Sequence, residues 1–413
     1  MAVTDSDQLG LYISIPFCRS KCTYCNFASG VFPAREHARY IQRLITEMRQ
    51  ARRWSENLSV HLPEWVDTIY LGGGTPSLLE PELIEQLFAA IRSEFSIVPN
   101  AEITVECAPG QLSDETLAAF LRVGVNRISL GVQSFIDQEA SHSGRLHSRA
   151  IVLNDLIRLR SAGIDKINLD LIAGLPGQTF ASWQESVAEL ISAGSPHASV
   201  YMLEVDDESR LGRELLSGGA RYHADVVPSD DTIARMYEYA IFALAHAGLA
   251  QYEISNFALP GRESRHNLRY WERRPYLGVG LDASSMLRES ALTSGSEEPG
   301  FILRSTTTDD LTAYLKGAQS PETSWLSPDR QHEEAWFLGL RLNSGVSISA
   351  MRSEFGNHRV ARALEIVSQL AARDLVVADI ENVRLTPQGR LLSNDVFQEF
   401  LETSAADLQP TSL

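Results

Sequence analysis

Short apolar segments alternate with amphipathic helical patterns through the first half of this chain. Runs rich in β-branched residues occur at 11–16 (LYISIP), 67–74 (DTIYLGGG) and 126–133 (NRISLGVQ), and stretches of helical period such as 34–54 and 81–95 lie between them. Strands that alternate with helices form parallel sheets joined by crossover helices. Six such units predict an α/β fold whose core is a partial or full (β/α) barrel.

Unusual motifs follow the predicted strands. A cysteine-rich loop follows the first strand, GGGTP the second, ECAPG the third, GVQSF the fourth and AGLPGQT the fifth. In (β/α) barrels the carboxyl ends of the strands form the functional face. We therefore expect these motifs to meet at one site.

The second half of the chain has a different pattern. Its middle part is less regular, and a polar stretch at 294–300 is predicted to be a loop. Three helical patterns and a hairpin with a turn near 381–382 then predict a small winged-helix-like α+β domain. We divide the chain into a core of residues 1–240, an accessory region of residues 241–320 and a C-terminal domain of residues 321–413.

Composition narrows the classes of partner. Among 413 residues, 36 Lys and Arg against 53 Asp and Glu give a net charge of −17, which disfavours nucleic acid or an anionic membrane as a broad partner. Winged-helix domains can bind DNA, but the acidic net charge of the chain favours a structural role for this domain over DNA binding. We find neither a leader peptide nor a membrane-spanning run, and we expect a cytoplasmic protein, either monomer or dimer.

Three of the four cysteines lie in the loop after the first strand. Cys18, Cys22 and Cys25 have the spacing C-x3-C-x2-C, which can hold three irons of a 4Fe–4S cluster and leave the fourth iron open to a small molecule. A structural zinc site is the alternative, but it needs four ligands. His37 is available as a fourth ligand, but its helical pattern predicts that it faces solvent. Cys107 is expected to be a small buried residue, so the cluster is favoured.

Several motifs together resemble a known superfamily. The segments are YISIPFCRSKCTYC, YLGGGTPSLL, NRISLGVQSF, INLDLIAGLPGQT and YEISNFA. They resemble the radical S-adenosylmethionine (SAM) enzymes, and in particular the branch that contains the anaerobic coproporphyrinogen III oxidases and the HemW-type haem chaperones. The resemblance covers nearly the whole chain and implies a radical-SAM barrel of the partial (β/α)6 form. It also implies that the open iron chelates the amino and carboxylate groups of SAM, which the cluster can cleave to a 5′-deoxyadenosyl radical.

The resemblance also assigns residues to SAM. Gly73 and Gly74 let the backbone approach a ligand closely, although a tight turn is the alternative explanation. The resemblance places both glycines and Thr75 at the methionine end of SAM. Asp170 lies between apolar residues, which suits an inward carboxylate for a ribose hydroxyl. The positions that the resemblance assigns to further SAM contacts are Tyr12, Tyr24, Glu106, Gln133, Arg145 and Asp170.

Two functions compete within this branch. One is an oxygen-independent oxidase that decarboxylates the propionates of coproporphyrinogen III with SAM radicals, and the other is a haem carrier. The oxidases have the cysteine pattern C-x3-C-x2-C-x-C. This chain has Phe27 in place of the fourth cysteine of that pattern, as HemW-type proteins do. Oxidases also have a longer segment before the cluster. These features favour a haem chaperone that delivers haem to an unidentified acceptor protein, and we assign no catalytic residue.

The segment HNLRYW at 266–271 matches the H-N-x-x-Y-W motif associated with haem in HemW-type proteins. In a helix, His266 and Tyr270 would share one face, and a neutral imidazole is a good axial ligand for haem iron. Without the resemblance, an amphipathic helix with a solvated arginine face would be preferred. The resemblance assigns haem contacts to His266, Asn267, Tyr270 and Trp271. The arginines expected to pair with the two haem propionates are Arg262, Arg265, Arg269, Arg273 and Arg274.

Three positions depart from the family pattern. Ser14 stands where the family has histidine, and Asp282 and Ser284 replace a glycine and a second histidine. Two histidines that would contact a tetrapyrrole are therefore absent, which leaves His266 as the candidate haem ligand.

Overall fold

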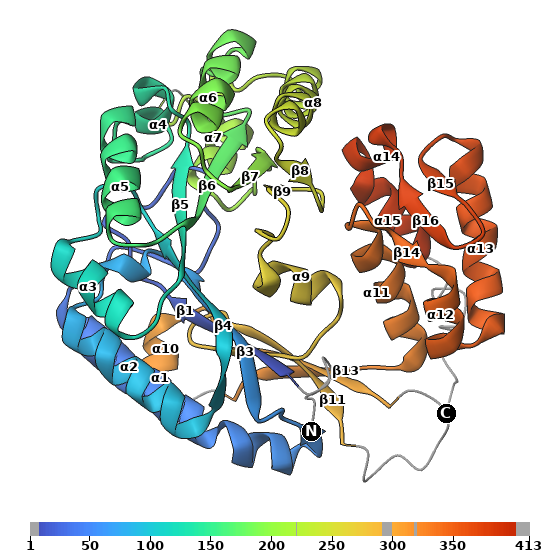
Figure 1. Cartoon of the computed structure of the whole chain (residues 1–413), viewed down its shortest axis with the longest axis horizontal. Coiled ribbons are helices and arrows are strands. Elements are labelled where there is room, and N and C mark those ends of the chain that lie inside the picture. Colours follow the sequence, from blue (N-terminus) through green and yellow to red (C-terminus); the bar gives the residue numbers. More distant parts are fainter. Residues whose placement is uncertain (1–7, 220, 291–299, 318–319, 402–413) are drawn as a thin grey trace.

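Six parallel strands form the centre of the larger sheet, as the sequence predicts (Figure 1). The computed structural model describes residues 8–219, 221–290, 300–317 and 320–401. Each strand is buried on both faces, which suits its near-continuous apolar sequence. The six strands, in spatial order, are β1 (Gln8–Ile15), β3 (Trp65–Gly73), β4 (Ser96–Cys107), β5 (Arg127–Gln133), β6 (Lys166–Ala173) and β7 (His197–Met202).

Helices between these strands cover the outer face of the sheet (Figure 1). In the first of them Tyr40, Ile41, Leu44 and Met48 are buried, and this spacing places them on one apolar stripe against the strands. The main covering helices are α1 (Arg35–Asn57), α2 (Pro81–Glu94), α3 (Asp114–Arg122), α5 (Arg149–Ser161), α6 (Phe180–Ser192) and α8 (Asp230–His246). Shorter helices are α4 (Asp137–His142), α7 (Arg210–Ser217) and α10 (Leu311–Lys316), with 3-10 turns η2 (Pro76–Leu78) and η3 (Ala224–Val226).

The irregular middle of the sequence extends this sheet at both edges. Beyond β1 lie β10 (Tyr276–Val279), which is parallel to it, and then the antiparallel strands β11 (Ser284–Glu289), β12 (Ile302–Thr306) and β13 (Glu322–Leu326). Beyond β7 lie β9 (Asn256–Ala258) and β8 (Ala250–Gln251), and β2 (Val60–His61) pairs with β11. The two edges do not pair with each other, so the barrel is partial.

The C-terminal part has its own core, built around Trp336, Phe355, Leu370 and Phe400. It contains helices and a small sheet, as expected for a winged-helix-like unit, and the predicted hairpin turns at 379–381. Its helices are α11 (Pro328–Leu340), α12 (Ile348–Phe355), α13 (Asn357–Ala372), α14 (Pro387–Leu391) and α15 (Ser393–Leu401). Its strands are β14 (Val346–Ser347), β15 (Val376–Ala378) and β16 (Asn382–Leu385). The division into three domains stays a prediction.

Two further expectations concern the polar loop at 294–300 and membrane-spanning helices. Most of the predicted loop at 294–300 lies outside the described residues. Within the described ranges, none of the helices combines the length and the apolar character needed to cross a bilayer.

A buried cluster of charges closes the amino-terminal end of the barrel. Asp67 of β3 is fully buried and pairs with Arg269, with Arg274 at 3.0 Å and with Arg265 at 3.3 Å. Arg269 is also fully buried, and a Cβ added at Gly10 would lie 2.3 Å from its side chain. Glycine in β1 therefore makes room for this guanidinium. The cluster fixes α9 (Arg265–Trp271), which carries the HNLRYW motif, beneath the strands.

Candidate functional site

A cavity of about 350 Å³ lies at the carboxyl ends of the strands, where the sequence predicts the functional face. This volume is within the range of pockets that hold small ligands, roughly 300–1,000 Å³. The cavity brings together every residue predicted for the cluster and all but one of those predicted for SAM. Its lining includes Cys18, Cys22, Tyr24, Cys25, Gly73, Gly74, Thr75, Glu106, Gln133, Arg145 and Asp170. Tyr12 is the exception, although its hydroxyl lies 3.5 Å from the place of a Cβ on Gly73.

Backbone hydrogen bonds hold the cysteine loop against the barrel. The amide of Cys18 donates to Gly30 O at 2.9 Å, and the amide of Thr75 donates to Phe17 O at 2.7 Å. Lys21 closes the loop by donating to the carbonyls of Phe27 and Ser29. Among the described residues, no three His, Cys, Asp or Glu side chains are placed to share a single metal ion. All three cysteines nevertheless open onto the same cavity, which is the placement that a cluster of several irons needs.

The backbone of the cysteine loop packs so closely on the GGGTP motif that Gly74 has no room for a side chain. A Cβ on Gly74 would lie 2.8 Å from both Ile15 O and Phe17 O, and Gly73 has a φ of +96°. No other residue fits at Gly74 without moving the cysteine loop. The glycines thus let the second strand end pack against the start of the loop, and the tight-turn explanation holds for them whether or not a ligand is bound.

Two carboxyl groups face the cavity from β4 and β6. Burial raises the pKa of Glu106 to about 7, and the Tyr70 hydroxyl donates to its Oε1 at 2.9 Å. Burial also raises the pKa of Asp170, whose Oδ1 accepts from Asn168 at 2.6 Å. Arg145 is the cation facing them and donates to the Tyr24 hydroxyl at 3.0 Å. Such a mixed set suits a zwitterionic or cationic ligand with hydroxyl groups.

Several buried polar atoms on the lining of this cavity lack a partner. Gln111 Oε1, Gln133 Oε1 and Arg145 Nε are among those with no hydrogen bond within the described part of the chain. Gln133 also has a φ of +70°, a strained conformation for a residue with a side chain. Buried polar groups are ordinarily satisfied, so these atoms indicate a site completed by a bound molecule. The residues present therefore fit a polar ligand next to three thiols.

The structure corrects one expectation about histidine and agrees with one about cysteine. His37 was expected to face solvent, but it is buried, packs against Phe17 at 4.1 Å between ring centroids and hydrogen-bonds Glu80 at 3.1 Å. A helix position says nothing about a partner that lies 43 residues away in the sequence. Cys107 is buried, as predicted, although it also lines the cavity.

The HNLRYW motif is helical, and His266 and Tyr270 share one face as predicted. His266 is almost fully buried, with Nδ1 2.9 Å from Thr68 Oγ1 and Nε2 2.9 Å from the Tyr270 hydroxyl. Burial, with the charge of Arg269 beside it, lowers the pKa of His266 to about 3. The imidazole is therefore neutral, but both ring nitrogens are engaged within the protein.

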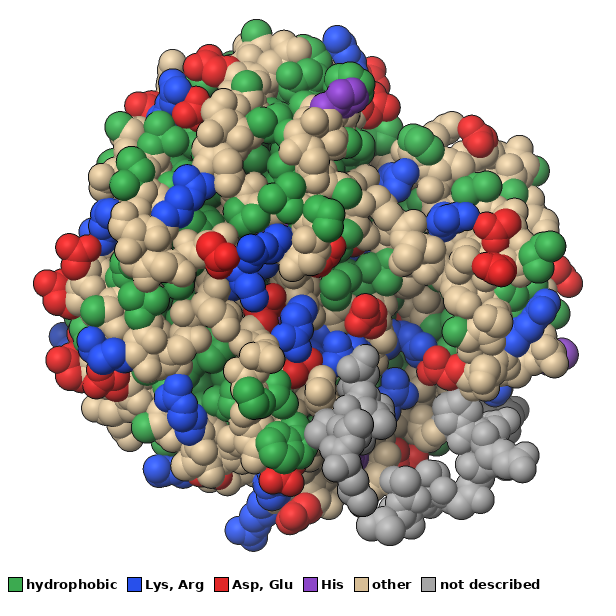
Figure 2. Space-filling model, in the orientation of Figure 1, with side chains coloured by type: hydrophobic (Ala, Val, Ile, Leu, Met, Phe, Trp, Pro, Cys, Tyr) green, Lys and Arg blue, Asp and Glu red, His purple; other side chains and the backbone are tan. Residues whose placement is uncertain are grey.

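The arginines around this motif already have carboxylate partners. Arg265, Arg269 and Arg274 pair with Asp67, while Arg273 pairs with Glu354 at 2.6 Å. Figure 2 shows basic and acidic side chains interspersed in the middle of its face, between the barrel and the C-terminal part. The arginines are thus ion-paired rather than free, and the fully buried Arg269 could reach a propionate only if the helix moved. The side chains of Arg265 and Arg262 are the most exposed of the set, at 43% and 36%, and Arg262 contacts Asp165 at 3.1 Å.

Tyr70, an aromatic side chain that joins the cavity to this helix, was not identified from the sequence. Tyr70 bonds Glu106 at the cavity, and its ring stacks on His266 with 5.2 Å between centroids. Tyr12 lies beside both rings, at 6.2 Å from Tyr70 and 6.5 Å from His266. The signal for Tyr70 was its position in the predicted strand. Tyr12 and Tyr70 are register partners on the adjacent strands β1 and β3, so their side chains lie on the same face of the sheet.

The chain matches known families over most of its length. Residues 12–190 match the radical SAM superfamily, and residues 326–392 match the HemN C-terminal domain. The haem chaperone HemW of Lactococcus lactis is 35% identical over 94% of this chain and 96% of its own length. The chain belongs to the HemW family. HemW of Bacillus subtilis is 34% identical over 94% of this chain and 98% of its own length.

The fold of this HemW family member is also found in a solved structure. Coproporphyrinogen III oxidase (HemN) of Escherichia coli, a radical SAM enzyme, superposes with a TM-score of 0.80 at 21% identity. The match covers 97% of this chain and 91% of that one. At this identity the likeness concerns the fold, and it confirms the radical-SAM partial barrel with its C-terminal domain.

Proposed function

We propose that this protein is a haem chaperone that binds haem and passes it to an acceptor protein. Membership of the HemW family carries the proposal, because relatives that align along nearly the whole chain are named haem chaperones. Phe27 supports it, since an exposed aromatic side chain on the cavity rim stands where the oxidase pattern has a cysteine. The proposal includes a cytoplasmic location and leaves the acceptor unnamed.

The same proposal assigns the cavity to a 4Fe–4S cluster and SAM. Cys18, Cys22 and Cys25 would hold the cluster, which supplies an electron for SAM cleavage when both are bound. Glu106 would accept a hydrogen bond from the SAM amino group, and this contact would favour its ionised form. Asp170 would accept from a ribose hydroxyl. The unpartnered atoms of Gln133 and Arg145, and the hydroxyls of Tyr12, Tyr24 and Thr75, would complete the polar lining.

The haem site is proposed at α9, with His266 as the iron ligand and Asn267, Tyr270 and Trp271 around it. The Trp271 indole N–H is buried without a hydrogen-bond partner in the described structure, so this side chain can take one from a ligand. Because His266 Nε2 is bonded to Tyr270, ligation through this nitrogen requires that bond to break. A small movement of α9 would therefore accompany haem binding.

A pair of variants tests this site in opposite directions. His266→Ala removes the ligand and should weaken haem binding and shift the Soret band. Tyr270→Phe keeps the ring but releases Nε2, so haem should bind about fivefold more tightly, since a net hydrogen bond is worth about 1 kcal/mol. Anaerobic absorbance titrations of the full chain measure both. Weaker binding in Tyr270→Phe together with an unaltered spectrum in His266→Ala would place the iron ligand elsewhere.

A further inference from the structure

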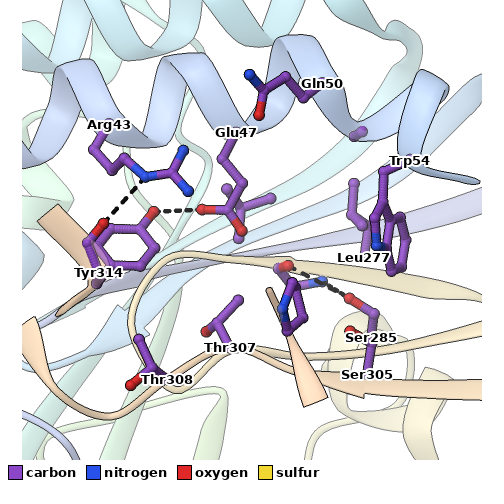
Figure 3. Close-up of a pocket in the computed structure, with 14 residues that line it drawn as sticks. Arg43, Glu47, Gln50, Trp54, Leu277, Ser285, Ser305, Thr307, Thr308 and Tyr314 are labelled. Atoms are coloured by element: carbon purple, nitrogen blue, oxygen red, sulfur yellow. Dashed lines mark hydrogen bonds between the residues drawn. The ribbon is translucent and has the colours of Figure 1, made fainter. Parts of the chain in front are cut away.

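A second cavity, of about 120 Å³, lies between α1 and the strands β10, β11 and β12 (Figure 3). It shares no lining residue with the cysteine cavity. Ala51, Leu277 and Val279 give it apolar walls, and Trp54 lies at one end. Because alanine at position 51 is short, space remains beneath the helix.

The other end of this cavity carries a cation and an anion from the same face of α1. Arg43 and Glu47 are four residues apart, a spacing at which such side chains commonly pair. Here each is held by Tyr314 instead. Arg43 Nε donates to Tyr314 O at 3.1 Å, and the Tyr314 hydroxyl donates to Glu47 Oε2. Within the described residues the two side chains form no ion pair with each other.

This arrangement leaves one carboxyl oxygen of Glu47 and the terminal guanidinium nitrogens of Arg43 without hydrogen-bond partners among the described residues. Glu47 Oε2 also accepts from Gly280 N at 3.3 Å, whereas Oε1 has no hydrogen-bond partner in the described chain and lies on the other side of the carboxyl group (Figure 3). The terminal guanidinium nitrogens of Arg43 likewise have no such partner there. Burial raises the pKa of Glu47 to about 7, so its carboxylate form, which can accept hydrogen bonds at both oxygens, predominates above that pH.

We propose that this cavity binds a single-ring heterocycle with an N–H donor beside a carbonyl group, as in pyrimidine bases and other cyclic amides. The N–H would donate to Glu47 Oε1 and the carbonyl would accept from Arg43, while the ring would pack between Trp54 and Leu277. The size limits the ligand to a single ring, because this cavity of about 120 Å³ is smaller than the apolar cavity of about 150 Å³ that holds a benzene molecule. The site is separate from the proposed haem and SAM sites and does not depend on them.

Uracil and 1,3-dimethyluracil are the probes for this site. They have the same ring, but the second lacks both N–H groups. Calorimetric titration of the full chain should show uracil binding at least about tenfold more tightly, since a hydrogen bond to a charged group contributes about 1.5–3 kcal/mol. Glu47→Gln should weaken uracil binding about tenfold for the same reason. Glu56→Gln, an exposed change on the same helix, should leave it unaltered.

A second variant locates the ligand without touching the charges. Ala51→Leu fills the space beneath α1 and should abolish uracil binding while the iron content and the thermal midpoint stay near those of the parent chain. The proposal is overturned if uracil does not bind at about 10 mM, a concentration well above ordinary weak affinities. Equal binding of the two probes, or unchanged binding in Glu47→Gln, would also overturn it.

Discussion

Replacing Cys18, Cys22 or Cys25 with alanine should lower the iron of the reconstituted chain from about four per molecule to near zero. Each thiol opens onto the same cavity, and a cluster held by three protein ligands cannot spare one. The brown absorbance should disappear with the iron. Iron and sulfide analysis after anaerobic reconstitution measures the effect.

Two control variants separate the cluster from its surroundings. Cys107→Ala should keep full iron content, although Cys107 lines the same cavity. Asp170→Ala should also keep the cluster but should reduce the change that SAM makes in the EPR signal of the reduced protein. Zinc in the anaerobically purified chain, with no cluster after reconstitution, would contradict the cluster assignment.

Asp67→Ala should cost about 3–5 kcal/mol of unfolding free energy, because it leaves a buried cation without its partner. Arg269 is fully buried, and Asp67 is its carboxylate partner. Arg265 and Arg274 would lose the same carboxylate, so mutual repulsion would add to the loss. Denaturant unfolding followed by circular dichroism should show a large fall in the midpoint.

A surface ion pair provides the matched comparison. Asp165→Ala removes the ion-pair partner of Arg262. The side chain of Asp165 is 70% exposed and that of Arg262 is 36% exposed. Exposed pairs contribute about 0–1 kcal/mol, so the midpoint should barely move. Similar midpoints for Asp67→Ala and Asp165→Ala would show that the buried cluster has no special role in holding α9 beneath the barrel.

The sequence was sufficient for elements whose pattern is local. The strand ending at Gly73 and helix α1 follow from apolar runs and helical spacing. The loop of Cys18, Cys22 and Cys25 lines one cavity, and its role as a cluster site stays a prediction. Because parallel strands end at one edge, the motifs after them could be assigned to one site.

Features that depend on distant partners could not be predicted. Arg269 can be buried because it pairs with Asp67, which lies 202 residues earlier in the sequence. No local sequence pattern predicts a pairing over this distance. For the same reason the arginines near His266 looked available for propionates, and His37 looked exposed. The outer strands β10 to β13 were missed because they lie in a stretch without regular alternation. β10 joins the sheet through a parallel pairing with β1, which is far away in the sequence, and β11 to β13 follow it with antiparallel pairings.

Anaerobic titration of the reconstituted full chain with haem tests the central claim most directly. A haem chaperone should bind about one haem per chain and develop a Soret band that saturates at that ratio. The same preparation, given coproporphyrinogen III and SAM under reducing conditions, should release no carbon dioxide. Absence of the Soret band, together with conversion of coproporphyrinogen III to protoporphyrinogen IX, would contradict the account and identify an oxidase instead.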